Sequence, residues 1–271
     1  MPEETFIYDA MKKQLDEAEK EDDVPAAPKR RAFPAKLSPQ DQKLVDSIYR
    51  ESGTISSMPG GEVKAGDIKR LKGLTWINDE IVTFFAVMIN ARTKAMLAGE
   101  GGLVREDFVK AYSFTSFFYT KFETAGYAGV KRWSKKVDLF DHDVVIIPIN
   151  CNNMHWVCSA INVRQKRFEY YDSLGNQNPK VYANLRSYLA QEHLDKKKKA
   201  IDLSEWTDYW YDDIPIQNNS SDCGIFTCQF MESLSRGVEE FDFTQQQMPY
   251  FRNKMVLELK KKEFLLEPWK A

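Results

Sequence analysis

The first half of the chain repeats apolar residues at helical spacing. After Asn78 and Asp79, five apolar side chains are spaced so that they fall on one face of a helix: Ile81, Phe84, Phe85, Met88 and Ile89. A shorter helix is predicted over residues 41–50, and the glycines within residues 99–102 indicate a loop. The first half is therefore expected to be helical.

In the middle of the chain, the pattern of apolar residues changes from helical spacing to strand-like runs. Residues 144–149 are dominated by β-branched apolar side chains, which is typical of a buried strand. Residues 155–163 and 167–171 are two further strand-like runs, and the polar turn at residues 164–166 joins them into a predicted hairpin.

Helical spacing returns in the last third, over residues 179–194, 223–236 and 245–264. The order is thus helices, then a small sheet, then helices again. This order predicts an α+β fold, with a small central sheet flanked by helices.

The N-terminal residues differ from the rest. Residues 1–23 are highly charged, and residues 24–39 hold four prolines and the basic patch Lys29-Arg30-Arg31. Such a stretch is typical of a tether and not of a core element. We therefore expect a charged, proline-rich extension over residues 1–36 and one globular domain over residues 37–271.

The composition of the chain argues against several classes of protein. A formal net charge of −2 argues against a nucleic-acid binder. The sequence shows neither an apolar run long enough to span a membrane nor a signal peptide. Four cysteines in 271 residues do not make a disulfide framework. We expect a monomer with reduced thiols, as in the cytosol or the nucleus.

One cysteine lies where a polar loop becomes an apolar helix, in the stretch PIQNNSSDCGIFTC. Asp222 or Ser221 is expected to cap this helix and Gly237 to end it. Cys223 then falls in the first turn, where unpaired N–H groups and the helix dipole favour a thiolate. The alternative is that Cys223 is simply a small apolar residue at a helix start.

A nucleophilic cysteine needs a base and a group that orients the base. The chain has three histidines. His142, between two aspartates, and His193, beside Glu192, are expected at ordinary surface positions. His155 starts the predicted hairpin, and Asp172 follows its returning strand, so a carboxylate can hold one imidazole nitrogen while the other faces a thiol.

Two other kinds of active site have less support in the sequence. Cys151, His155 and Cys158 could be metal ligands, but strand alternation places Cys158 on the opposite face from His155, and no Cys-x-x-Cys pair supports the site. A serine hydrolase of the elbow type needs Gly-x-Ser-x-Gly, which is absent from the sequence. We therefore expect neither a metal nor a cofactor.

These residues together resemble a known family. His155-Trp156, Asp172, and Gln217 six positions before Cys223 follow the pattern of the Ulp/SENP cysteine proteases, which act on SUMO. Four further stretches look like the same family: GLTWINDEIVTFF, SFFYTKFETAGYAGVKRWSKKVDLF, YYDSLG and FTQQQMPYFRNKMV. The similarity runs from about residue 37 to the C-terminus. Ile77 departs from the usual leucine, and Ser220 stands where glycine is common.

The resemblance implies a papain-like fold with the triad in the order His, Asp, Cys. Cys223 would attack the carbonyl of the C-terminal Gly-Gly of SUMO, with His155 as general base and Asp172 as its orienting partner. Gln217 would donate its side-chain amide to the oxyanion. The products would be SUMO freed from a target lysine or matured from its precursor.

The resemblance also implies substrate contacts. Trp76 and Trp156 match the two tryptophans that close over the Gly-Gly tail, and Asp79 matches the position that pairs with an arginine on SUMO. A protease for another modifier of the NEDD8 type and a non-catalytic SUMO-binding module are the alternatives. A nuclear location is expected from the family, with the nuclear envelope and the cytoplasm as alternatives.

Overall fold

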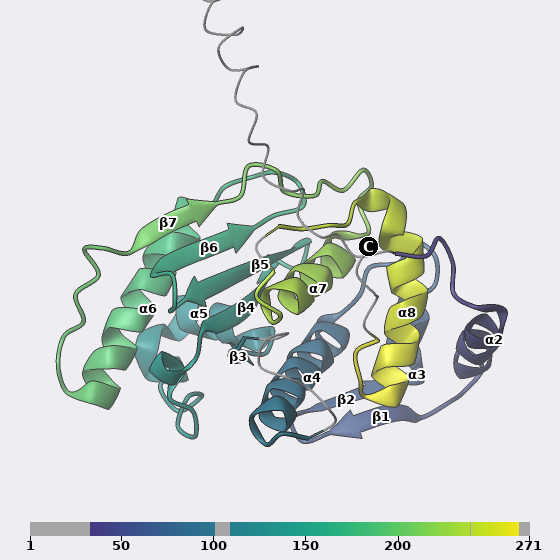
Figure 1. The fold of residues 1–271 in the computed structure, drawn as a ribbon, viewed down its shortest axis with the longest axis horizontal. Coiled ribbons are helices and arrows are strands. Elements are labelled where there is room, and N and C mark those ends of the chain that lie inside the picture. Colours follow the sequence, from purple (N-terminus) through teal and green to yellow (C-terminus); the bar gives the residue numbers. More distant parts are fainter. Residues whose placement is uncertain (1–32, 101–108, 239, 266–271) are drawn as a thin grey trace, which may run out of the picture. The chain divides into compact units, whose positions relative to one another are not determined.

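A five-stranded mixed sheet forms the centre of the molecule. The computed structural model describes residues 33–100, 109–238 and 240–265 (Figure 1). The strand order is β3-β4-β5-β6-β7. Their bounds are β3 Ala111–Ser113, β4 Val144–Cys151, β5 His155–Asn162, β6 Arg167–Tyr171 and β7 Thr207–Trp210. The three middle strands are antiparallel and each edge strand is parallel to its neighbour.

Side chains of the central strand β5 alternate between two cores, as the pleat requires. Trp156, Cys158 and Ala160 belong to one apolar cluster, and Val157 and Ile161 to the other. The first cluster is covered by α4 (Asp79–Leu97), α7 (Cys223–Leu234) and α8 (Met248–Lys261). The second is covered by α5 (Phe117–Val130) and α6 (Pro179–Lys197). The fold is therefore α+β, as the sequence predicted.

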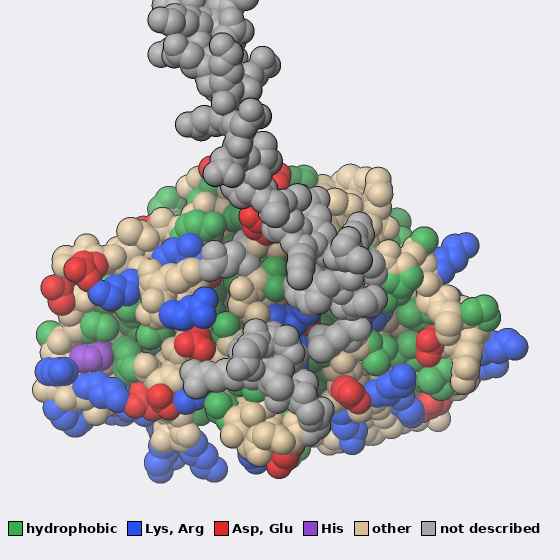
Figure 2. All heavy atoms as spheres, viewed as in Figure 1, with side chains coloured by type: hydrophobic (Ala, Val, Ile, Leu, Met, Phe, Trp, Pro, Cys, Tyr) green, Lys and Arg blue, Asp and Glu red, His purple; other side chains and the backbone are tan. Residues whose placement is uncertain are grey.

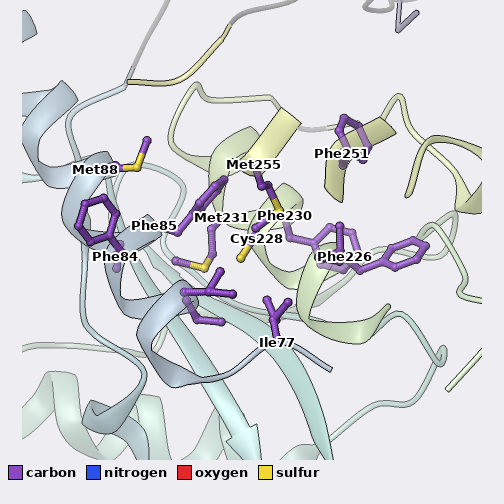
Figure 3. Close-up of a cluster of buried hydrophobic side chains, with 14 of the residues drawn as sticks. Ile77, Phe84, Phe85, Met88, Phe226, Cys228, Phe230, Met231, Phe251 and Met255 are labelled. Carbon is purple, nitrogen blue, oxygen red and sulfur yellow. The ribbon is translucent and has the colours of Figure 1, made fainter. Parts of the chain in front are cut away.

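Helix α7 is buried along its whole length and packs on β4 and β5. In Figure 3, Phe84, Phe85 and Met88 of α4 lie near Cys228, Phe230 and Met231 of α7, with Met255 of α8 beside them. The apolar face predicted for α4 is confirmed, since all five of its residues are buried. Such all-round burial holds the first turn of α7 in one place.

The remaining elements lie around α8. Helix α2 (Pro39–Ile48) packs on α8, and the hairpin β1 (Thr54–Met58) and β2 (Gly61–Lys64) leads into α3 (Ala65–Ile68) and η1 (Lys69–Leu71). Figure 1 shows α2 on the side of α8 away from the sheet, and the β1–β2 hairpin below α4 and α8. The other short helices are η3 (Leu139–Asp141) and η4 (Gln245–Gln247).

The expectation of a helical first half was wrong at β1 and β2. Thr54–Met58 is rich in serine and shows no strict alternation in its burial, so its sequence carries no strand period. The edge strands β3 and β7 have three and four residues, too few for a periodic pattern. Helix α5 is broken at Gly126, whose φ of +60° lies in the left-handed region.

Charge on the surface is mixed. On the face shown in Figure 2, lysine and arginine side chains alternate with acidic ones, in keeping with the net charge of −2. Within the described residues, no helix is both long and apolar enough to cross a bilayer. Most of the expected extension over residues 1–36 lies outside the described residues, so that domain boundary stays a prediction.

Candidate active site

Cys223 begins α7 and is 3% exposed. The residue after it, Gly224, is held against two other segments: a Cβ there would lie 2.4 Å from Cγ1 of Ile77 and 3.3 Å from Cδ1 of Trp156. Only glycine fits such close contacts without a shift of its neighbours. The first turn of α7 is therefore pressed onto the start of β5 and onto the segment that carries Trp76.

His155 and Asp172 meet at the same end of the sheet. The Nε2 atom of His155 donates to Oδ1 of Asp172 at 2.6 Å. Asp172 is 2% exposed, and its Oδ1 also accepts from the backbone N–H of Leu174 at 2.8 Å. The backbone turn after β6 thus fixes the carboxylate, and the carboxylate fixes the ring of His155.

The other side of the imidazole faces the thiol. His155 also interacts with Cys223, and Nδ1 is the ring nitrogen that Asp172 leaves for this contact. Burial alone would lower the pKa of His155, but its interactions with Asp172 and Cys223 raise that pKa to about 9. The structure therefore brings the three predicted triad residues together, with His155 in the middle.

The other three cysteines have different surroundings. Burial, with the charge of Asp172 next in importance, raises the pKa of Cys151 to about 11. Burial likewise raises the pKa of Cys158 and of Cys228. These thiols stay protonated at neutral pH, which makes them poor nucleophiles. Among these four thiols of the described chain, Cys223 is the one that interacts with a histidine.

Gln217 links the two loops on either side of the triad. Its backbone N–H donates to the carbonyl of Ser173 at 2.8 Å, and its Oε1 accepts from the hydroxyl of Ser173 at 2.6 Å. Its Nε2 donates one hydrogen to the carbonyl of Asn219 at 2.5 Å. A primary amide carries a second hydrogen on the same nitrogen, which is what an oxyanion donor requires.

The three predicted substrate residues lie on two segments beside Cys223. Trp156 follows His155 and is 5% exposed, because it packs against the start of α7. Trp76 is 43% exposed, and it is joined to α7 through its neighbour Ile77. Asp79 is half-buried in the first turn of α4, where its charge complements the helix dipole.

Comparisons with known proteins agree with this geometry. The Ulp1 protease family, C-terminal catalytic domain, matches residues 75–264. The chain belongs to this family. A sentrin-specific protease of Caenorhabditis elegans is 43% identical over 199 residues, which cover 73% of this chain and 27% of that protein. Human sentrin-specific protease 2 is 36% identical over 205 residues, or 75% of this chain and 33% of the relative.

The fold is that of the Ulp1 protease domain. The solved structure of the C-terminal Ulp1 protease domain in complex with Smt3, the yeast orthologue of SUMO, has a TM-score of 0.69 and 26% identity to this chain. That match covers 84% of this chain and 96% of the solved one. The chain spans about a third or less of the length of these two curated relatives.

Two expectations about the Ulp1-like site were wrong. Asp222 takes the N-cap position of α7, but its carboxylate bonds no helix N–H; it pairs with Arg252 and accepts from Asn219 and Gln245. His193 was expected at the surface, yet it is 8% exposed, with its Nδ1 2.8 Å from the carbonyl of Lys199. The chain folds back over the end of α6 and covers that ring.

The other candidate sites lie apart from the triad. His142 precedes β4, at the opposite end of that strand from Cys151, and its Nδ1 lies 2.8 Å from the carbonyl of Asp138. Among the described residues, no group of histidine, cysteine and acidic side chains is arranged to hold a metal ion.

Sequence reasoning missed several residues that support the site, notably Ser173, Asn219 and Arg252. The position of Arg252 in the sequence could have indicated a buried ion pair. It lies on the buried face of α8 between Met248 and Met255, where a charged side chain needs a partner. The partner itself is 30 positions away in sequence, so spacing could not have named it.

Proposed function

We propose that this chain is a cysteine protease that hydrolyses the bond after the C-terminal Gly-Gly of SUMO. The observation that carries the proposal is the position of His155, which is hydrogen-bonded to Asp172 and also interacts with Cys223 at the start of α7. Membership of the Ulp1 protease family supports the same chemistry.

The reaction follows from this geometry. Cys223, as a thiolate paired with the His155 imidazolium, attacks the glycine carbonyl carbon and forms a tetrahedral adduct. His155 gives its proton to the leaving amine as the C–N bond breaks, which leaves a thioester on Cys223. Water, deprotonated by His155, then hydrolyses the thioester and frees SUMO with its C-terminal carboxylate. Asp172 keeps the ring oriented and stabilises its charged form.

Two hydrogen-bond donors are placed to stabilise the developing oxyanion. The backbone N–H of Cys223 lies at the N-terminus of α7, where the first N–H groups have no partner within the helix. The second donor is Nε2 of Gln217, held in place by Ser173 and Asn219. Donors fixed before the reaction stabilise the charged adduct at no reorganisation cost.

The substrate assignment rests on the relatives. Two of these relatives are named sentrin-specific proteases, and the Ulp1 domain was solved in complex with a SUMO orthologue. In this proposal, Trp76 and Trp156 enclose the Gly-Gly tail, and Asp79 pairs with an arginine on SUMO. The leaving amine is a target lysine or the N-terminus of the precursor's tail.

A SUMO carrying a C-terminal vinyl sulfone tests the chemistry directly. We expect one covalent adduct with the wild-type protein and none with Cys223→Ala. Cys151→Ala is the matched control, since Cys151 lies opposite His155 in the β4–β5 register and should leave the adduct intact. Binding of SUMO without an adduct would instead favour the non-catalytic binding module.

A further inference from the structure

Arg252 joins the two segments that flank the nucleophile. It lies in α8 and is 4% exposed. Its Nε and Nη2 bind Oδ1 of Asp222 at 2.8 and 2.7 Å, and Nη2 also donates to the carbonyl of Ser221 at 3.1 Å. Its Nη1 donates to the carbonyls of Arg70 and Thr75 at 3.2 and 3.0 Å. One guanidinium thus bridges the residues before Cys223 and those before Trp76.

The carboxylate of Asp222 is held from three directions. Its Oδ2 accepts from Nδ2 of Asn219 and from Nε2 of Gln245, both at 2.7 Å, while Arg252 holds Oδ1. Asp222 is 1% exposed. A buried carboxylate is stable only when paired and fully hydrogen-bonded, and these contacts supply that.

The segment that carries Trp76 has little structure of its own. Residues 72–78 form no helix or strand, and Leu74 and Trp76 are both exposed. A cavity of about 200 Å³ separates part of this segment from α8, lined by residues that include Leu71, Gly73, Leu74 and Arg252. Arg252 lines this cavity and also binds the carbonyls of Arg70 and Thr75, which anchors the segment to α8.

We propose that Arg252 is a positioning residue for the reaction, which holds the nucleophile's segment and the Trp76 segment at a fixed distance from each other. This inference rests on the proposed function, in which Cys223 attacks the end of a tail enclosed by Trp76. A misplacement of about 1 Å between reacting groups can cost about 100-fold in rate.

Charge gives Arg252 a second effect. Asp222 is the chain neighbour of Cys223, and an unpaired carboxylate there would oppose formation of the thiolate. His155 and Cys151 also interact with Cys223, and Asp172 acts on both of these groups. The positive charge of Arg252 neutralises the negative charge of Asp222. The planar guanidinium of Arg252 makes five hydrogen-bond or ion-pair contacts, and the single ammonium group of lysine cannot make all of them.

The test compares Arg252→Lys and Arg252→Gln with the wild-type protein. Three quantities are measured: kcat and KM on a SUMO fusion with a fluorogenic leaving group, and the alkylation rate of Cys223 by iodoacetamide without SUMO. We expect both variants to lose about tenfold or more in kcat/KM, through both kcat and KM. Arg252→Gln should also slow alkylation, and adding Asp222→Asn to it should restore alkylation without restoring KM.

Arg92→Gln is the matched control. Arg92 is another arginine with a mostly buried side chain, 8% exposed against 5% for Arg252, and its Nη1 binds Glu232 of α7 at 2.9 Å, near the opposite end of that helix. It should lower the melting temperature as Arg252→Gln does, but leave kcat, KM and alkylation close to the wild-type values. If the Arg252 variants match this control in all three quantities, Arg252 is a stability residue and the inference is wrong.

Asp222→Asn keeps the test decisive should Arg252→Gln fail to fold. It removes the charge that Arg252 binds while leaving the contacts of Arg252 to Arg70 and Thr75 in place. We expect a severalfold lower kcat with KM unchanged; an unchanged kcat contradicts the inference. Because alkylation needs no SUMO, a wild-type protein that alkylates normally but cleaves no SUMO would overturn the proposed substrate and not the role of Arg252.

Discussion

Two thiols on the same buried helix have opposite surroundings. Cys223 begins α7, where polar side chains from β5, from the turn after β6 and from α8 converge. Cys228, one and a half turns along, is fully buried among Phe84, Phe85, Phe230 and other apolar residues. Both are about equally inaccessible to solvent, so burial does not distinguish them. The neighbouring groups distinguish them, because Cys223 has a histidine and a helix N-terminus beside it and Cys228 has neither.

The largest effect is expected from exchanging the nucleophile. Cys223→Ser should abolish cleavage of a SUMO fusion while its affinity for SUMO stays close to wild type, since an alcohol is a far weaker nucleophile here than a thiolate. Cys228→Ala should retain turnover and lower the stability by about 1 kcal/mol. Turnover and thermal unfolding of both variants check the contrast; normal turnover by Cys223→Ser would remove that thiol from the mechanism.

Asp172→Asn should have the next largest effect. An amide in place of the carboxylate neither orients the imidazole correctly nor stabilises its charge, and we expect a loss of about 10³- to 10⁴-fold in kcat. Asn178, which lies outside the triad contacts, provides the matched control as Asn178→Ala. Equal rates for the two variants would show that Asp172 does not act on His155.

The pH dependence follows from the raised pKa of His155. The ordinary value is 6.5 and the folded value is about 9, so the imidazolium persists to high pH and is lost as the pH rises through about 9. We expect kcat/KM to fall along an alkaline limb near pH 9. In Asp172→Asn that limb should move to lower pH, because the charge that raises the pKa is gone. An unmoved limb would assign it to another group.

Gln217→Ala is expected to have a smaller effect. The usual loss for one oxyanion donor is about 100-fold or somewhat more, and it should fall on kcat with KM nearly unchanged. Ser173→Ala removes only the hydroxyl that holds Oε1 of Gln217 and should cost less. Steady-state kinetics separate the cases: an effect confined to KM would make Gln217 a binding contact.

Asp79→Ala should have the smallest effect. Asp79 is half-buried at the start of α4, so its pair with an arginine on SUMO would lie at a wet rim, where charge pairs contribute little. We expect a severalfold rise in KM at unchanged kcat. Glu80→Ala, which removes the neighbouring exposed charge, is the control, and an equal effect from it would indicate a general charge effect.

The sequence predicted the parts of the site that neighbouring elements create. The β5–β6 hairpin brings His155 and Asp172 to one end of the sheet, and strand periodicity alone located both. The position of Cys223 at a helix start followed from the change of pattern at Asp222. Local rules were sufficient because each of these placements depends on one or two consecutive elements.

Contacts between distant elements could not be predicted in the same way. Asp222 or Ser221 was expected to cap α7, but the carboxylate of Asp222 binds Arg252 of α8 instead, because a hydrogen bond between two charged groups is stronger than one to a neutral N–H group. The burial of His193 depends on how the residues after α6 fold back. The hairpin of β1 and β2 was missed because it is stabilised by packing on α4 and α8, and not by its own pattern.

The most direct test of the account compares three modifiers on one leaving group. SUMO, NEDD8 and ubiquitin are each fused to the same fluorogenic amine, and release is followed with the wild-type protein and with Cys223→Ser. The account predicts rapid release from SUMO that depends on Cys223, and essentially none from NEDD8 or ubiquitin. Faster release from NEDD8 or ubiquitin than from SUMO would contradict the substrate assignment and leave only the cysteine protease chemistry.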